Sequence, residues 1–261
     1  MPFVKFKEKK IQYSKKGNGK AIVFLHGYLE AAIVWEELDN FFSNDFTSIC
    51  IDLPGHGQSE LIEEIQTMEL MAEAVNEVLE NEKISEALII GHSMGGYVAL
   101  EFYAKYPNKV SGLCLFHSTP FADDAQRVEY RNQIIELIKG GKHILLAKEH
   151  VEKTFAKHNL EKFEQKIGFF KVVAVNTPPK TAISVLEGMK IRKDNTKTLE
   201  NINKKALWIL GTEDNFIPLE VTNKLKLPQN VKVKKMENVG HQGYVENFSK
   251  TVEILTEFFN I

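Results

Sequence analysis

Short apolar runs and helical apolar patterns alternate along the first half of the chain. Runs that are apolar throughout predict strands covered on both faces. They occur at residues 21–25, 47–51, 88–90 and 110–116. Between them, apolar residues recur at helical spacing, most regularly from Met68 to Leu79, with Thr67 as a candidate N-cap. This alternation predicts an α/β fold with a doubly wound, mostly parallel sheet.

The N-terminal segment follows a different pattern. Apolar and polar residues alternate at residues 3–6 and again at residues 10–13. Alternation of this kind indicates strands with one exposed face. We therefore expect an antiparallel pair at the edge of the sheet.

The strand–helix alternation is interrupted between residues 118 and 195, where we find only helical patterns. It resumes with an apolar run at 206–210 and a predicted strand at 231–236, and a closing helix follows the candidate cap Asn247. We therefore predict two parts of the chain. An α/β core comprises residues 1–117 and 196–261, and a helical lid is inserted at residues 118–195.

Composition narrows the class of protein. The chain has 261 residues, 43% of them apolar, which is enough for a sizeable core, and its formal charge of −2 argues against a nucleic-acid binder. Both cysteines, Cys50 and Cys114, lie in apolar runs without metal or redox spacing. We find no signal-peptide pattern and no apolar run long enough for a membrane span. We expect a cytoplasmic protein with a small-molecule substrate, no cofactor, and no nucleic-acid or membrane partner.

One motif carries candidate chemistry. Gly91-His92-Ser93-Met94-Gly95 lies between an apolar run and a helical pattern. A strand that turns at once into a helix holds the central serine on a sharp, strained bend, with its hydroxyl exposed above the sheet. The backbone N–H of Met94 would then lie at a helix N-terminus, where developing negative charge is stabilised. This context predicts Ser93 as a nucleophile.

A serine nucleophile needs a base, and the base needs a group that orients it. Two loops that follow predicted strands late in the chain offer both, because they contain Asp214 and His241. The order Ser, Asp, His is the order found in this type of strand–turn–helix site. Glu213 beside Asp214, and Asp123 and Asp124 after an earlier strand, remain alternatives for the acid.

These motifs together resemble the α/β-hydrolase superfamily, in its branch of serine hydrolases with a helical lid. The matching segments extend over nearly the whole chain. They are Leu25-His26-Gly27, the loop from Asp52 to Ser59, Gly91 to Gly96, Gly211 to Asp214, and Gly240-His241. The resemblance implies that Ser93 is the nucleophile, His241 the base and then the acid, and Asp214 the orienting carboxylate. It also implies an oxyanion hole formed by the backbone N–H groups of Tyr28 and Met94.

The resemblance leaves several reactions open. A carboxylesterase acting on a small, rather apolar ester is our first expectation. Hydrolysis of a carbon–carbon bond, lactone opening, aminopeptidase or perhydrolase action, and a synthase-like lyase reaction use similar sites. Dehalogenases and epoxide hydrolases of this superfamily carry an aspartate where this chain has Ser93. A small-molecule receptor with slow or no turnover is an alternative of another class.

The remaining histidines and the aromatic residues of the lid have simpler interpretations. We expect His26, His56 and His92 to be hydrogen-bonded structural residues of their loops. None of the histidines is paired at metal-ligand spacing, so we predict no metal site. Four apolar residues of the predicted lid either line a substrate pocket or hold the lid on the core. They are Phe163, Phe169, Phe170 and Met189.

Overall fold

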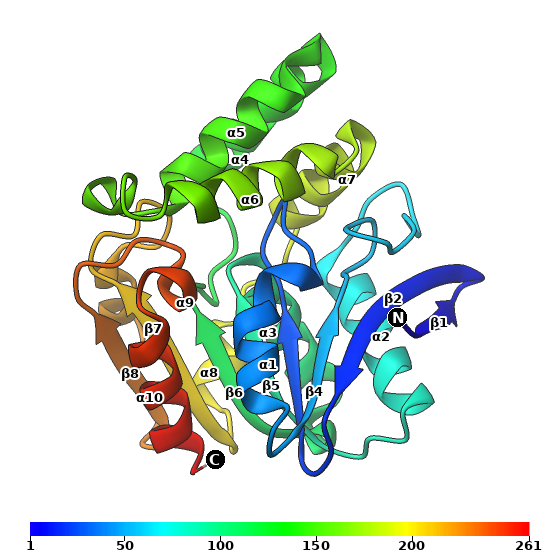
Figure 1. Cartoon of the computed structure of the whole chain (residues 1–261), viewed down its shortest axis with the longest axis vertical. Helices are drawn as coiled ribbons and strands as arrows, with labels where there is room; N and C mark the ends of the chain where they lie inside the picture. The colour runs from blue at the N-terminus through cyan, green and yellow to red at the C-terminus, as the bar shows by residue number, and fades with distance from the viewer. Residues whose placement is uncertain (261) are drawn as a thin grey trace.

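A computed structural model describes residues 1–260 and contains one eight-stranded sheet with the strand order β1-β2-β4-β3-β5-β6-β7-β8 (Figure 1). The strands are β1 (Phe3–Phe6), β2 (Lys9–Lys16), β3 (Ala21–Leu25), β4 (Thr47–Ile51), β5 (Ala87–His92), β6 (Val110–Phe116), β7 (Lys205–Gly211) and β8 (Val231–Met236). Strands β3 to β8 pair in parallel, whereas β1 pairs with β2 and β2 with β4 antiparallel. The predicted parallel sheet and its antiparallel edge pair are thus confirmed.

Helices cover both faces of this sheet. Figure 1 shows α1 (Glu36–Phe42) and α10 (Phe248–Phe259) in front of the strands, whereas α2 (Met68–Asn81), α3 (Met94–Lys105) and α8 (Thr196–Glu200) pack together behind them. A short helix, α9 (Gly243–Glu246), precedes α10. The central strands β3, β4 and β5 are buried along their whole length, which explains their continuous apolar runs.

The two predicted helix caps are present. The hydroxyl oxygen of Thr67 accepts a hydrogen bond from the backbone N–H of Leu70 at the start of α2. The side-chain oxygen of Asn247 accepts one from the N–H of Lys250 at the start of α10. Each cap satisfies a backbone donor that has no partner within the helix.

The chain between β6 and α8 is helical, as predicted, and forms a layer above the carboxyl ends of the strands (Figure 1). Its helices are α4 (Ala125–Leu137), α5 (His143–Thr154), α6 (Glu164–Asn176) and α7 (Pro179–Lys190). Helices α4 and α5 form a hairpin, joined by a π-helical turn that is kinked at Gly141, where φ is +82°. The division into core and lid at residues 118 and 195 stays a prediction.

Helix α7 is held closely against the core. A side chain at Gly188 would collide with the backbone carbonyl of Gln66, in the loop that precedes α2. The hydroxyl of Ser184 donates to the carbonyl of Glu64 in the same loop, at 2.5 Å. Two adjacent contacts therefore attach α7 to the sheet domain.

Among the described residues, none of the helices combines the length and the apolar content that crossing a membrane requires.

Candidate active site

Ser93 lies on a strained turn between β5 and α3. Its backbone has φ +49° and ψ −114°, whereas β5 ends at His92 and α3 begins at Met94. Such a conformation is costly for a residue with a side chain, and it is found where surrounding structure holds it in place. The backbone N–H of Ser93 donates to the carbonyl of Phe116 in β6, at 2.9 Å. The strained turn expected from Gly-x-Ser-x-Gly is present.

Close packing explains the glycine two positions after Ser93. A Cβ atom on Gly95 would overlap the backbone carbonyl of Leu25 at the end of β3. Helix α3 therefore begins directly against the neighbouring strand. Only a residue without a side chain allows this approach.

The structure brings Asp214 and His241 together from loops that follow β7 and β8. The Nδ1 atom of His241 lies 2.8 Å from Oδ2 of Asp214. The other carboxylate oxygen accepts the backbone N–H groups of Phe216 and Ile217, at 2.8 and 3.0 Å. Asp214 is thus fixed by its own loop and oriented toward the ring of His241.

A second histidine, His117, contacts the same carboxylate oxygen. It directly follows β6, and its Nδ1 atom lies 3.1 Å from Oδ2 of Asp214. His117 is fully buried, and burial lowers the pKa of its ring to about 4. The ring is therefore neutral, and its Nδ1–H donates to Asp214. Burial alone would raise the pKa of Asp214, but the two histidines together hold it well below its usual range.

A buried ion pair connects the segments around Ser93. Oε2 of Glu30 accepts the N–H of Gly27 at 2.6 Å and lies 3.1 Å from Nδ1 of His92. The other oxygen accepts the side-chain amide of Gln242, at 2.7 Å. Nε2 of His92 lies 2.8 Å from the backbone carbonyl of His241, so both ring nitrogens face acceptors and the ring carries a proton on each.

The charges of this pair shift both pKa values. Burial disfavours ionisation of Glu30, yet His92 and the hydrogen bonds to the carboxylate lower its pKa to about 2. Burial likewise opposes protonation of His92, but the carboxylate of Glu30 raises the pKa of the ring above its ordinary value. One carboxylate therefore ties together the loops that carry Gly27, His92 and His241.

The two backbone groups expected to form an oxyanion hole come from separate elements. Tyr28 follows β3, and Met94 is the first residue of α3. The neighbouring N–H of Gly27 is used by Glu30. Within residues 1–260, neither the N–H of Tyr28 nor that of Met94 donates to another group of the chain, so both are free to bind a ligand oxygen.

The other predicted acids and histidines have structural partners. Nε2 of His26 accepts the N–H of Leu53, and Nδ1 of His56 lies 3.3 Å from the carbonyl of Pro54. Three alternative acids lie outside the Asp214–His241 pair. Asp123 binds two arginines, Asp124 caps α4, and Glu213 contacts His158 at the surface.

The donor atoms of His117, Asp214 and His241 lie within 4.8 Å of one another, which is a possible metal-ligand grouping. The carboxylate of Asp214 already accepts hydrogen bonds from both rings and from two backbone N–H groups. Its lone pairs are therefore in use. These residues fit a hydrogen-bonded acid–base pair, and we assign no metal to them.

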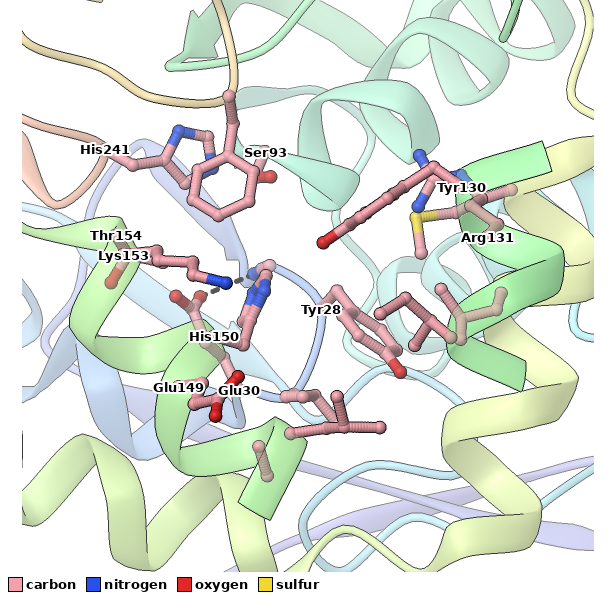
Figure 2. A pocket seen from close by; sticks show the side chains of 18 of the residues that line it. Tyr28, Glu30, Ser93, Tyr130, Arg131, Glu149, His150, Lys153, Thr154 and His241 are labelled. Atoms are coloured by element: carbon pink, nitrogen blue, oxygen red, sulfur yellow. Dashed lines mark hydrogen bonds between the residues drawn. The ribbon is translucent and has the colours of Figure 1, made fainter. Parts of the chain in front are cut away.

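Ser93 and His241 line one cavity of about 110 Å³ beneath the helical layer. Figure 2 shows both residues on one side of this cavity, with Tyr28, Tyr130 and Lys153 around it. Its apolar lining comes mainly from the inserted helices: Ile134, Ile138, Leu146, Ala147, Leu186 and Met189. Within residues 1–260 the hydroxyl of Ser93 is not hydrogen-bonded to His241. We expect this contact to form with substrate, because catalytic hydrogen bonds are often long until substrate binds.

Of the four apolar residues singled out in the predicted lid, only Met189 lines this cavity. Phe163 and Phe170 pack against Phe155, and Phe169 is 39% exposed.

The sequence analysis missed Glu30 and His117 as hydrogen-bond partners of His92 and Asp214, and it missed Arg127 and Arg131 as residues that line the cavity. The two arginines are four residues apart on a predicted helix, which places them on one face and was the available signal.

Known proteins resemble this chain over most of its length. A family model described as alpha/beta hydrolase fold matches residues 20–248. A pimeloyl-[acyl-carrier protein] methyl ester esterase of Wigglesworthia glossinidia brevipalpis is 25% identical over 94% of this chain and 96% of its own length. A 2-hydroxy-6-oxononadienedioate/2-hydroxy-6-oxononatrienedioate hydrolase of Paraburkholderia phymatum is 25% identical, over 96% and 91%.

A third relative is longer than this chain. The dihydrolipoyllysine-residue acetyltransferase component of an acetoin cleaving system from Cupriavidus necator is 26% identical over 91% of this chain, which spans 63% of that protein. Among solved structures, an esterase from Thermogutta terrifontis superposes with a TM-score of 0.90 at 22% identity, covering 97% of this chain and 93% of that one. At this identity the likeness shows the fold.

Proposed function

Because this chain is an enzyme of the α/β hydrolase fold family, we propose that it hydrolyses a small ester through an acyl-enzyme formed on Ser93. One observation carries the proposal. Ser93, on its strained turn, lines the same cavity as His241, whose Nδ1 is held by Asp214 at 2.8 Å. A nucleophile, a base and an orienting carboxylate are the parts that this chemistry needs.

His241 acts as the base in the first step. Its Nδ1–H donates to Asp214, which leaves Nε2 with a lone pair to accept a proton. The hydroxyl oxygen of Ser93 attacks the ester carbonyl and passes its proton to Nε2. The carbonyl oxygen becomes an oxyanion, which the N–H groups of Tyr28 and Met94 bind. One such donor stabilises the transition state by about 3 kcal/mol.

The second half of the reaction returns the enzyme to its starting state. The bond to the leaving alcohol breaks, and the alcohol departs with the proton from His241. Water then gives a proton to His241 and attacks the acyl-enzyme, which releases the carboxylic acid and restores the hydroxyl of Ser93. The buried carboxylate of Asp214 stabilises the imidazolium that forms twice in each cycle.

The cavity supports a substrate with an apolar acyl chain of moderate length. Side chains of α4, α5 and α7 surround the space above Ser93 with aliphatic carbon, including Ile134, Leu146 and Leu186. Burial of such a chain is favourable by about 0.8 kcal/mol per methylene. The methyl ester esterase among the relatives supports an ester as the bond that is cleaved.

The first experiment is hydrolysis of p-nitrophenyl esters from acetate to octanoate by the wild type and by Ser93→Ala. We expect multiple turnover by the wild type, an optimum at intermediate chain length, and loss of at least 10³-fold of the activity in Ser93→Ala. Ser43→Ala is the matched control, because Ser43 lies at the far end of α1 and its hydroxyl contacts only the carbonyl of Asn40. Absence of turnover with every ester would overturn the esterase proposal and leave a carbon–carbon hydrolase or a ligand sensor.

A further inference from the structure

Three cationic side chains contribute to the lining of the cavity above Ser93. Arg127 and Arg131 from α4 and Lys153 from α5 line it, and we call these three side chains the cationic wall. An adjoining hollow, open to solvent, shares Arg127, Lys153 and Tyr130 with the cavity. Figure 2 shows the Lys153 ammonium and the Tyr130 hydroxyl directed into the cavity. Arg127 and Lys153 therefore lie where the cavity adjoins the solvent-open hollow.

Arg131 is held in place by a carboxylate that cannot neutralise it. Its Nε and Nη2 atoms donate to Asp123 at 2.5 and 3.3 Å. Arg192 donates to the same carboxylate of Asp123 at 2.6 Å, and its guanidinium group also stacks on the ring of Tyr97. Two guanidinium groups thus share one carboxylate, which leaves an excess positive charge. Within residues 1–260, Nη1 of Arg131 has no hydrogen-bond partner.

The other two cations are also available to a ligand. Arg127 uses one Nη2–H on the backbone carbonyl of Phe216, at 3.0 Å. The ring of Phe216 in turn lies 5.0 Å from that of His241. The Lys153 ammonium has no ion-pair partner within residues 1–260, and its side chain is exposed. All three side chains of the cationic wall therefore retain N–H groups that could donate hydrogen bonds to a ligand.

Few anionic groups oppose the cationic wall. Glu30 lines the cavity but is paired with His92, so the two charges cancel. Glu149 lines the cavity from an exposed position on α5. His150 is neutral because burial lowers the pKa of its ring to about 4. Asp124 lines the adjoining hollow, where its side chain caps α4. Three cationic side chains thus line the cavity itself beside one carboxylate that is unpaired within residues 1–260, that of Glu149.

We propose that the cationic wall binds a carboxylate of the substrate, so that the enzyme acts on an anionic ester. This inference rests on the proposed ester hydrolysis at Ser93 and names the class of ester. An arginine fork held by a buried carboxylate is preorganised for a second carboxylate. The carboxylate lies at the cationic wall, the aliphatic chain lies against α5 and α7, and the ester carbonyl reaches Ser93.

Two p-nitrophenyl esters that differ in one group test this inference. Mono-p-nitrophenyl adipate and p-nitrophenyl hexanoate have six-carbon acyl chains, and only the adipate carries a terminal carboxylate. We expect a higher kcat/KM for the adipate ester at low salt, and a falling preference as salt screens the cationic wall. Arg131→Gln should lower the ratio of the two kcat/KM values about 10- to 100-fold, which is the range for loss of a charge-assisted hydrogen bond.

Variants and a binding measurement separate the outcomes. Arg127→Gln repeats the test should Arg131→Gln fail to fold, and Lys148→Gln is the control, since Lys148 is exposed on the same helix as Lys153 but does not line the cavity. An unchanged ratio in both arginine variants, or wild-type preference for the hexanoate ester, overturns the inference. If neither ester is hydrolysed, the proposed function fails. In that case, calorimetry measures the binding of both esters to Ser93→Ala. Tighter binding of the adipate ester supports the inference, and equal affinities overturn it.

Discussion

At the scale of single residues, hydrogen bonds between buried groups hold the candidate site in place. The Nδ1 atoms of His117 and His241 lie 3.1 and 2.8 Å from the same oxygen of Asp214. Hydrogen bonds from both rings hold this carboxylate toward His241. His117 is therefore a positioning residue for Asp214, and its loss should change how that carboxylate titrates.

We expect His117→Ala to lower kcat about tenfold or more, because Asp214 loses a hydrogen bond to a charged group. His117→Asn should recover part of the loss, since asparagine can donate and tolerates the left-handed backbone, with φ +47°, at this position. The pH dependence of unfolding is a second readout, because it reports the titration of the His117–Asp214 pair.

The sign of that dependence follows from the lowered pKa of Asp214. A carboxyl with a lowered folded-state pKa stabilises the protein above its ordinary value of 3.8, and this contribution is lost as pH falls through the folded-state pKa. The lowered pKa of His117 itself costs the wild type stability as pH falls from 6.5 to about 4, and the variant lacks this cost, so the stability gap between wild type and His117→Ala should narrow in that range. The variant also raises the folded-state pKa of Asp214, which narrows the gap further as pH falls through that raised value. A gap that stays constant from pH 7 to pH 3 would contradict the assignment.

The Glu30–His92 pair gives a second prediction at this scale. Glu30 has a lowered pKa and stabilises the fold above pH 4.5, whereas His92 has a raised pKa and stabilises it below pH 6.5. The stabilising effect of the pair is therefore greatest between these values. It declines as pH falls toward 2 or rises through the raised pKa of His92.

Glu30→Gln should destabilise the protein by about 3 to 5 kcal/mol at pH 5.5, because it leaves a buried charge without its partner. The loss should be smaller at pH 9.5. Glu253→Gln is the control, since Glu253 is 58% exposed and pairs with Lys250 at the surface, where such pairs contribute about 1 kcal/mol or less. Denaturant unfolding at both pH values measures the difference, and an equal loss at both would contradict this pH dependence.

The sequence predicted the chemistry of these residues unevenly. The strained turn at Ser93 could be predicted because its cause is local: a strand, two glycines and a helix within a few positions. His117 and Asp214 are 97 positions apart, and Glu30 and His92 are 62 apart. Only the folded sheet brings such pairs together, so the sequence pattern could not reveal them.

At the scale of elements, the α4–α5 hairpin shows how neighbouring glycines differ. Gly140 and Gly141 both lie at its tip with open space around them, but only Gly141 has a positive φ, +82°. An alanine at Gly141 must adopt a left-handed conformation that costs roughly 1–2 kcal/mol. An alanine at Gly140 meets no such cost and restricts the unfolded chain.

We therefore expect opposite effects from two adjacent substitutions. Gly141→Ala should lower the free energy of unfolding by about 1 kcal/mol, and Gly140→Ala should raise it by about 0.4–1 kcal/mol. Thermal unfolding of both variants beside the wild type measures the pair. Equal shifts in the same direction would show that the kink at Gly141 does not control the hairpin.

The helices and strands could be predicted from the sequence because their apolar residues recur at regular spacing. The apolar runs at 21–25, 47–51 and 110–116 coincide with β3, β4 and β6. What the periods could not supply was the direction in which the polar side chains of the inserted helices point. Arg131 lies at a helical spacing with Ile135 and Ile138, yet its guanidinium faces the cavity and Asp123.

At the scale of the whole molecule, the chain places one end of a rigid sheet under a helical cover. The alternation of strands and helices predicted the parallel sheet, and the interruption after β6 predicted inserted helices. The position of those helices over Ser93 depends on contacts such as that between Gly188 and Gln66, which pattern analysis cannot reveal. The proposed substrate class could be inferred only from the cavity, which is lined by residues of both the sheet core and the inserted helices.

The cationic wall has a consequence for the end of each catalytic cycle. Hydrolysis of an anionic ester turns a neutral ester carbonyl into a second carboxylate inside a cavity lined by Arg127, Arg131 and Lys153. The acid product is then a dianion and is attracted to the cationic wall more strongly than the substrate was. With such an ester as substrate, we therefore expect product inhibition, which slows the enzyme as its own acid accumulates.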